Sequence, residues 1–213
     1  MHLRPWLVST ATGCSAVLLS LVLMPCPASA GAPTDQLRSS IDQVIKVLED
    51  PGLKSQEPKR RAAIREVANN TFDFGEAAKR SLGRHWQGLS QSDREEFTSL
   101  FADLLERGYV ARIEEYSGEK IVYKGDTVDA DAATVKTQFT SKKGTDIPVD
   151  YRMLRRGDRW LVYDVSIEGL SLVNNYRGQF NKIIETSSYQ ELVKRMKARA
   201  EDFQAPASKK KQS

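Results

Sequence analysis

The sequence predicts an α+β protein: N-terminal helices, then an antiparallel meander sheet of about four strands, then two C-terminal helices. Three observations lead to this prediction. Apolar side chains recur at helical spacing over residues 34–114, and they alternate at the two-residue spacing of strands over residues 120–167. Helical spacing returns at Leu172. Strands that follow one another through short turns favour antiparallel pairing.

The segment from Arg159 to Phe180 contains the change from strand to helix. Its first half, up to Ile167, is an apolar run rich in β-branched and aromatic residues, which predicts a strand. Both faces of this strand are apolar, so we expect other parts of the chain to cover both sides. Strict alternation assigns the side chains to two faces, one with Leu161, Tyr163, Val165 and Ile167 and the other with Trp160 and Val162. Glu168 and Gly169 end the strand, and Ser171 is a candidate N-cap for the next helix.

The helices before the sheet are predicted from their apolar spacing and their caps. They cover residues 34–49, 58–69, 74–82 and 91–113, with Asp73 capping the third and Gly83 ending it. The fourth is the longest, and Ser90 with Asp93 resembles a capping box at its start. Its broad apolar stripe, from Phe97 towards Ile113, is typical of a core face or of the wall of an apolar cavity.

The remaining elements are shorter. The predicted strands cover residues 121–123, 134–140, 147–153 and 159–167. Ser187 or Ser188 caps a final helix, which we expect to extend to Phe203.

The ends of the chain predict export. Arg4, an apolar run over residues 6–24 and the site Ala28-Ser29-Ala30 are typical of a cleaved signal peptide at residues 1–30. A retained anchor or a lipid on Cys26 are the alternatives, and the small-x-small site favours cleavage. Both cysteines lie in this segment, so disulfides and thiolate sites are not expected in the rest. We expect one domain at 31–204 and a disordered basic tail at 205–213.

The sequence contains none of the common catalytic or cofactor motifs, such as Gly-x-Ser-x-Gly, His-Glu-x-x-His or a phosphate loop. His85 is the only histidine after the predicted signal peptide, and a structural role is expected for it because base catalysis needs a nucleophile nearby. Asp164, if buried, needs a partner such as Arg177. The sequence therefore predicts a protein without enzymatic activity, cofactor or metal.

One family resemblance connects these segments. The stretch WLVYDVSIEGLSLVNNYRGQF from Trp160 resembles the signature of the MlaC, or toluene-tolerance, family of periplasmic phospholipid shuttles. FDFGEAAKRSLGRHW from Phe72, LSQSDREEFTSLFADLLERGY from Leu89 and VDYRML from Val149 match the same family pattern in the same order. The residues that the resemblance marks as fold-specifying are Gly83, Trp86, Asp164, Gly169, Tyr176 and Arg177.

The resemblance implies a monomer that carries a phospholipid through the periplasm. It would exchange lipid with an inner-membrane ABC transporter bearing an MCE-domain protein and with an outer-membrane lipoprotein–porin complex, and so maintain outer-membrane asymmetry. A phospholipid has on the order of 30 acyl methylenes, whose exposure would cost about 24 kcal/mol at about 0.8 kcal/mol each, so the tails must be enclosed. The alternatives are a carrier of another apolar ligand, such as a hopanoid, or an enzyme with a sheet pocket.

The predicted lipid-binding residues have two sources. The resemblance supplies Tyr109, Val149, Tyr151 and Leu170. Periodicity alone supplies Phe101, Leu105, Leu161, Tyr163 and Val165.

Overall fold

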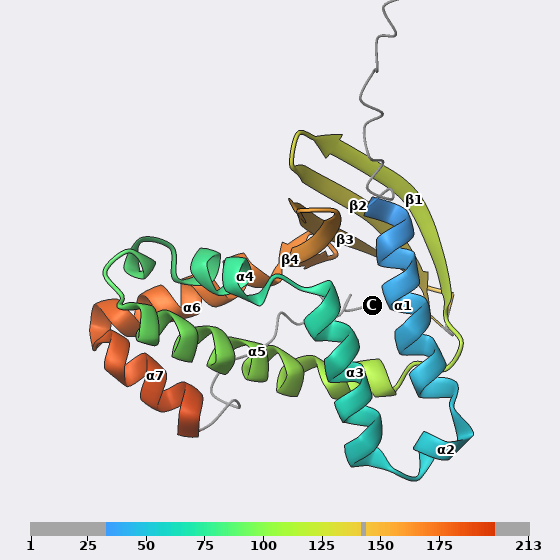
Figure 1. Cartoon of the computed structure of the whole chain (residues 1–213), viewed down its shortest axis with the longest axis horizontal. Coiled ribbons are helices and arrows are strands. Elements are labelled where there is room, and N and C mark those ends of the chain that lie inside the picture. Colours follow the sequence, from blue (N-terminus) through green and yellow to red (C-terminus); the bar gives the residue numbers. More distant parts are fainter. Residues whose placement is uncertain (1–32, 142–143, 199–213) are drawn as a thin grey trace, which may run out of the picture.

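The computed structural model describes residues 33–141 and 144–198 and has the predicted α+β architecture (Figure 1). The helices are α1 Pro33–Glu49, α2 Pro51–Lys54, α3 Glu57–Thr71, α4 Phe74–Leu82, the 3-10 helix η1 Gly83–Trp86, α5 Gln91–Glu114, α6 Leu172–Thr186 and α7 Tyr189–Ala198. The strands are β1 Lys120–Asp129, β2 Ala132–Thr140, β3 Asp146–Arg156, β4 Arg159–Ile167 and β5 Leu170–Ser171. The predicted signal peptide, the basic tail and Phe203 lie outside the described residues.

The sheet is an antiparallel meander in the order β1-β2-β3-β4-β5. The fifth strand is a two-residue addition that the sequence did not predict, and β1 is longer than the predicted residues 121–123. The first predicted helix, over 34–49, is followed by the short helix α2, because the Asp50 carboxylate accepts a hydrogen bond of 2.7 Å from the Gly52 amide and so caps a new turn.

A β-bulge in β4 corrects the predicted faces of this strand. Arg152 pairs with Asp164 and Met153 pairs with Val162, so Tyr163 is an extra residue on β4. The bulge reverses the alternation beyond it. Val165 and Ile167 therefore share the face of Trp160 and Val162, and the prediction that they lie with Leu161 and Tyr163 was wrong.

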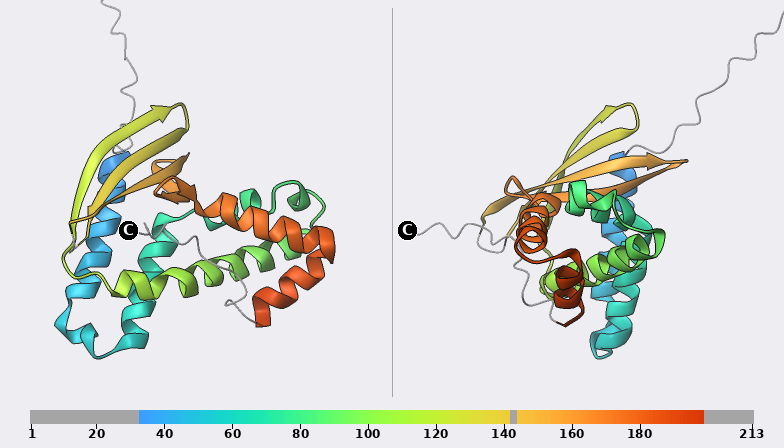
Figure 2. Two further views of the ribbon diagram at one scale, coloured as in Figure 1. Left: turned by 180° about the vertical axis from the view of Figure 1, so that it is seen from behind. Right: turned by 90° about the vertical axis from the view of Figure 1, so that its left-hand side faces the viewer.

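The buried residues form two separate hydrophobic clusters. The helical core joins α4, α5, α6 and α7 around the stacked and edge-on rings of Phe97, Phe101, Tyr176 and Phe180. The sheet core joins α1 to the inner face of β2, β3 and β4, with Leu37, Met153 and Val162 at its centre. Figure 2 shows these parts as a helical arm beside a sheet that α1 covers. The molecule thus has two cores and a junction between them.

Local caps and contacts fix the corners between these parts. The predicted caps are confirmed: Asp73 accepts from the Glu76 amide at 2.9 Å, Ser171 accepts from the Asn174 amide at 3.0 Å, and Ser90 forms a capping box with Asp93. Gly83 ends α4 at a φ of +55°, a conformation that favours glycine.

The buried Asp164 joins β4 to α6. Its carboxylate accepts hydrogen bonds from the Ser171 hydroxyl at 2.7 Å and the Val173 amide at 3.1 Å, and it pairs with Arg152 at 3.2 Å. The proposed partner Arg177 was wrong. Its guanidinium lies against Gly83, where an added Cβ would be 2.7 Å from Nη2. Arg177 therefore packs at the end of α4 and not in the β4 corner.

Candidate ligand-binding cavity

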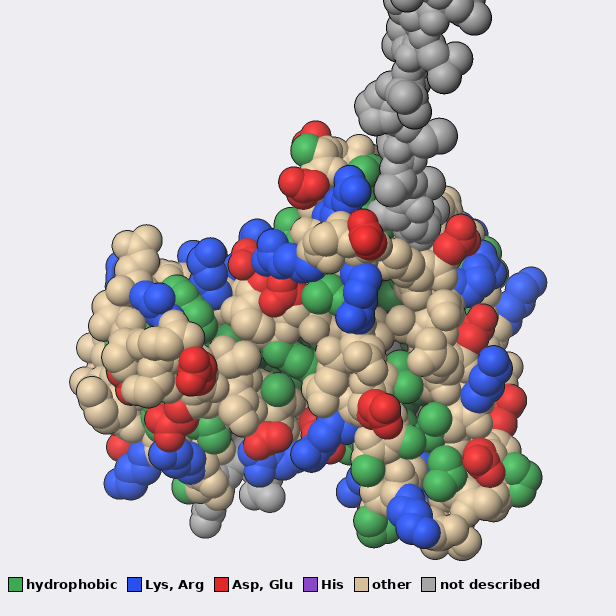
Figure 3. Space-filling model, viewed as in Figure 1, with side chains coloured by type: hydrophobic (Ala, Val, Ile, Leu, Met, Phe, Trp, Pro, Cys, Tyr) green, Lys and Arg blue, Asp and Glu red, His purple; other side chains and the backbone are tan. Residues whose placement is uncertain are grey.

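An open cavity of about 1030 Å³ lies at the junction of the two cores. It is bounded by α3, α4 and α5 on the helical side and by β3, β4 and the start of α6 on the sheet side. Figure 3 shows hydrophobic side chains at the surface where α3, α4 and α5 meet. This volume is at the upper end of the range for small-molecule sites.

The lining of α5 changes in polarity along the helix. Its residues face the cavity at intervals of three and four, as one side of a helix requires. In the first half this lining is polar, with Gln91, Arg94, Glu95, Thr98 and Ser99. In the second half it is mainly apolar, with Ala102, Leu105, Tyr109, Val110 and Ile113. A cavity with one polar and one apolar end suits an amphiphile.

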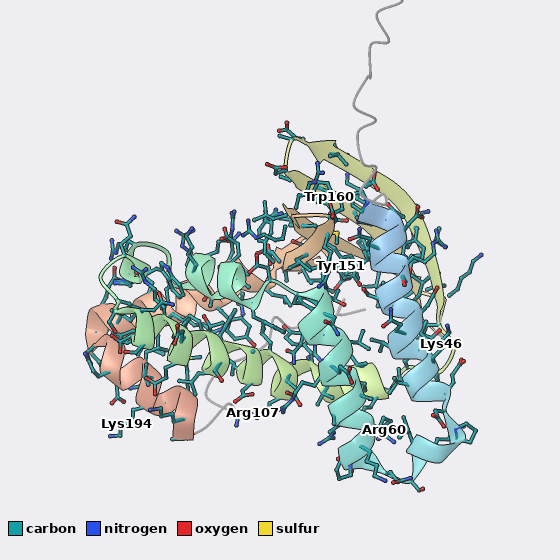
Figure 4. The ribbon with its side chains drawn as sticks, viewed as in Figure 1. Lys46, Arg60, Arg107, Tyr151, Trp160 and Lys194 are labelled. Carbon is teal, nitrogen blue, oxygen red and sulfur yellow. The ribbon has the colours of Figure 1, made fainter. Side chains whose placement is uncertain are left out.

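The sheet and α3 complete the apolar end. Tyr151 on β3 and Val165 and Ile167 on β4 form its floor, and the bulge in β4 is what turns the last two inward. Figure 4 shows Tyr151 at the junction of the sheet with α3. The opposite wall consists of Ile64, Ala68, Phe72, Phe74 and Leu172.

The two tyrosines of the apolar end remain neutral. Burial raises the pKa of the Tyr151 phenol and that of the Tyr109 phenol well above the usual value. The Tyr109 hydroxyl is buried and has no hydrogen-bond acceptor of normal geometry within the described residues. The apolar end thus contains no charge on either ring at neutral pH.

Ion pairs close the edge of the cavity between α3 and α5. Arg65 on α3 contacts Glu106 on α5 at 2.6 Å. Further along, Arg60 and Arg61 both bind the Glu114 carboxylate, at 2.8 Å and 2.9 Å. A second hollow of about 760 Å³ lies on the outer side of the Arg65–Glu106 pair. The Arg65–Glu106 pair therefore forms part of the cavity wall, and the Glu114 pairs join the same two helices beyond it.

The structure places the nine predicted lipid-binding residues in different environments. Leu105, Tyr109, Tyr151 and Val165 line the cavity. Two others are buried in the cores, Phe101 in the helical core and Val149 in the sheet core. The remaining three do not line the cavity: Leu161, Tyr163 and Leu170.

There is a physical reason why each of these last three residues does not line the cavity. The bulge leaves Leu161 and Tyr163 on the outer face of β4, where the Tyr163 ring lies 4.2 Å below the Arg80 guanidinium. Leu170 is in the short strand β5, and 39% of it is exposed. Sequence reasoning also missed the wall from α3 and α4, although the aromatic pair Phe72 and Phe74 was a signal for it: their rings stack at 5.6 Å.

The residues with reactive side chains have structural partners. His85 Nε2 is hydrogen-bonded to Asn181 at 2.9 Å, and the Ser171 hydroxyl is held between Asp164 and Asn174. Residues 33–141 and 144–198 contain no cluster of three or more side chains able to hold a metal ion. Over the same residues, no helix is long and apolar enough to span a bilayer.

The fold and the cavity define an α+β binding protein with an open, partly apolar ligand cavity between two cores. The chain belongs to the MlaC family, because the MlaC protein family model matches residues 38–198.

A curated relative from Haemophilus influenzae, the intermembrane phospholipid transport system binding protein MlaC, is 26% identical over 115 residues, or 50% of this chain. The match covers 54% of that relative, so this chain spans about half its length. A solved structure of a phospholipid-binding protein from Ralstonia solanacearum, in complex with a phospholipid, has the same fold. Its TM-score is 0.73 with 22% sequence identity, over 81% of this chain and 99% of that one.

Proposed function

We propose that this protein is a non-enzymatic carrier that holds the acyl chains of a phospholipid in the cavity between its two cores. The observation that carries the proposal is the open cavity of about 1030 Å³ whose lining changes from polar to apolar along α5. Enclosure offsets the cost of about 24 kcal/mol for exposing on the order of 30 methylenes to water. Membership of the MlaC family and the name of the Haemophilus relative support the same proposal.

The same reasoning extends to the place of action. We propose that the chain is exported by its signal peptide and acts in the periplasm as a monomer. There it would exchange lipid between an inner-membrane ABC transporter with an MCE-domain protein and an outer-membrane lipoprotein–porin complex, and so maintain the lipid asymmetry of the outer membrane. The family of the chain and its export signal support these steps.

Extraction of the purified secreted protein with organic solvent, followed by mass spectrometry, tests the proposal. The expected result is co-purified phospholipid in near-stoichiometric amount. A pentacyclic hopanoid instead would support the alternative carrier function. A protein from which no lipid is recovered, and which takes up none from vesicles, would contradict both.

Variants connect the bound lipid to this cavity. Tyr109→Glu puts a carboxylate among the apolar side chains of the cavity, where removing the charge from water is unfavourable, so lipid recovery should fall severalfold or more. Ala102→Trp fills the cavity without adding charge and should have the same effect.

Two control variants should keep normal lipid. Leu170→Glu adds a carboxylate at an exposed residue that does not line the cavity. Ala111→Trp matches Ala102→Trp in the size of the new side chain but places it at an exposed position of α5 outside the cavity. Normal lipid in Tyr109→Glu and Ala102→Trp would place the ligand elsewhere.

A further inference from the structure

Arg94, in the first turn of α5, lines the polar end of the cavity. Its Nη2 donates a hydrogen bond of 3.3 Å to the Gln87 carbonyl oxygen, and its guanidinium carbon lies 5.6 Å from the centre of the Trp86 ring. Its Nε is buried and has no hydrogen-bond acceptor among the described residues. A buried N–H without an acceptor costs about 1–3 kcal/mol, and more for a charged group. This cost requires an explanation.

The other cations that line the cavity are neutralised by carboxylates. Arg65 pairs with Glu106 at 2.6 Å, and Arg156 pairs with Asp73 at 2.8 Å. Lys79 lies 3.8 Å from Glu76. Within residues 33–141 and 144–198, Arg94 forms no ion pair with a carboxylate.

The acids near this end do not supply the missing acceptor. Glu76 accepts a hydrogen bond of 2.8 Å from Arg80, and Arg156 is a further neighbour at 3.6 Å. Glu95 accepts a hydrogen bond of 2.7 Å from Gln91. The buried Nε of Arg94 is thus left without an acceptor from the described residues, and a ligand that enters beside the guanidinium could supply one.

We propose that Arg94 binds the phosphate of the lipid headgroup, an inference that rests on the proposed function as a phospholipid carrier. A guanidinium presents N–H donors in a fork that matches two oxygens of a phosphate. The cation–π contact with Trp86 uses the face of the guanidinium and not its N–H groups. One helical turn further along the lining, Thr98 and Ser99 provide hydroxyl donors at the level of the ester groups.

The length of the cavity agrees with this orientation. Fifteen residues separate Arg94 from Tyr109, which is about 22 Å along a helix at 1.5 Å per residue. The acyl region of one leaflet is about 15 Å thick, half of a hydrocarbon core of about 30 Å. A phosphate at Arg94 therefore leaves room for the glycerol and places the ends of the chains at the apolar end, near Tyr109 and Tyr151.

Two lipids with identical chains test the assignment. Delipidated protein is loaded to equilibrium from vesicles that contain dioleoyl phosphatidylethanolamine or dioleoylglycerol, and the lipid recovered with the protein is measured. The unmodified protein should prefer the phospholipid by about tenfold or more, because a hydrogen bond to a charged group contributes that much. Arg94→Gln should reduce the preference to about twofold or less, and Arg94→Lys should retain part of it.

Arg107→Gln is the matched control, because Arg107 is an exposed arginine of the same helix that does not line the cavity. Figure 4 shows it on the side of α5 away from the sheet. It should keep the full preference. Thermal unfolding of each variant establishes that it is folded, and uptake of dioleoylglycerol by Arg94→Gln establishes that its cavity is intact.

The other possible outcomes distinguish failure of the Arg94 assignment from failure of the proposed function. If Arg94→Gln keeps the preference, or if the unmodified protein has none, the assignment of Arg94 is wrong and the carrier function stands. If the unmodified protein takes up neither lipid, the proposed function itself fails. If millimolar inorganic phosphate stabilises delipidated protein through Arg94 while lipid preference does not depend on Arg94, the site binds free phosphate and not a headgroup.

Discussion

Replacement of Glu114 by glutamine tests whether ion pairs hold α3 against the end of α5. The carboxylate accepts hydrogen bonds from Arg60 at 2.8 Å and 3.1 Å through Oε1 and from Arg61 at 2.9 Å and 3.2 Å through Oε2. Arg60 directs Nε and Nη2 at the one oxygen Oε1, whereas Arg61 also reaches Oε1 at 3.4 Å and so spans both oxygens. All of these hydrogen bonds join charged groups and are therefore stronger than neutral ones. Glutamine keeps the size of the side chain and removes the charge.

The magnitude follows from the exposure of the three side chains. Glu114 is 13% exposed, Arg60 18% and Arg61 40%. An exposed ion pair contributes about 0–1 kcal/mol, and loss of one partner of a fully buried pair costs about 3–5 kcal/mol. The partly buried cluster lies between these limits, so we expect Glu114→Gln to lower the free energy of unfolding by about 2 kcal/mol. The melting temperature should fall by about 4–8 °C for a chain of this size.

The pH dependence of the stability difference between the unmodified protein and Glu114→Gln identifies the cause of that difference. Hydrogen bonds from Arg61 and Arg60 lower the pKa of Glu114 below its value of 4.5 in the unfolded chain. The ionised carboxylate is therefore favoured in the folded state. Its contribution is fully present above about pH 4.5 and is lost as the pH falls through the lower, folded-state pKa. The difference between the two proteins should be constant from pH 8 to 6 and should shrink below pH 4.5.

Urea denaturation at several pH values is the assay, and Glu57→Gln is the control. Glu57 contacts the same Arg61 at 2.9 Å, but its side chain is 57% exposed, so the substitution should cost about 0.5 kcal/mol or less. Equal effects of the two substitutions, or an effect of Glu114→Gln that persists unchanged at pH 3.5, would refute the reasoning. If the carrier function holds, Glu114→Gln should also release lipid faster, because the wall between α3 and α5 is loosened.

Three further predictions concern the corners and the buried phenols. Gly83→Ala should cost about 2 kcal/mol or more in urea denaturation, because φ is +55° and the new Cβ would meet Arg177, whereas Gly88→Ala, with open space around it, should change stability by less than about 0.5 kcal/mol. Asp164→Ala should lower the free energy of unfolding by about 3 kcal/mol, because it leaves the buried Val173 amide without its hydrogen-bond acceptor. Asp158→Ala, at an exposed position, should change it little, and similar losses for the two variants would contradict this reasoning. Burial raises the pKa of Tyr123 to about 12, so its neutral phenol stabilises the fold below pH 10 and this contribution is lost as the pH rises towards 12. Tyr123→Phe should therefore reduce the loss of stability at alkaline pH. An unchanged dependence of stability on pH would show that another group causes the alkaline loss.

Local signals in the sequence determined most of the fold. The strand Arg159–Ile167 has the predicted bounds, and Asp73, Ser90 and Ser171 cap the predicted helices, because each depends only on neighbours within a few residues. The bulge at Tyr163 was not predictable from alternation, since an inserted residue leaves no break in an apolar run. This one residue explains why Val165 lines the cavity and Tyr163 does not.

The cavity was only partly predictable for a related reason. Periodicity finds the apolar face of a helix, but it does not tell which part of that face meets another helix and which part meets empty space. Phe101 and Leu105 belong to the same stripe of α5, yet Phe101 packs against Tyr176 and Phe180 while Leu105 lines the cavity. The division depends on where α6 leaves α5, which is a property of the tertiary structure.

The two cores explain why the cavity persists without collapse. Rings of α5 and α6 fill the helical core, and α1 covers the sheet core, so each core packs on one side while residues such as Leu105 and Val165 present their other side to the cavity. The apolar cavity lining is therefore surplus surface whose exposure to water is unfavourable. If the carrier function holds, a bound lipid removes this surface from water only in the folded state, so by mass action loading stabilises the fold. The proposed transfer to a partner would then need contacts that compensate the emptied protein.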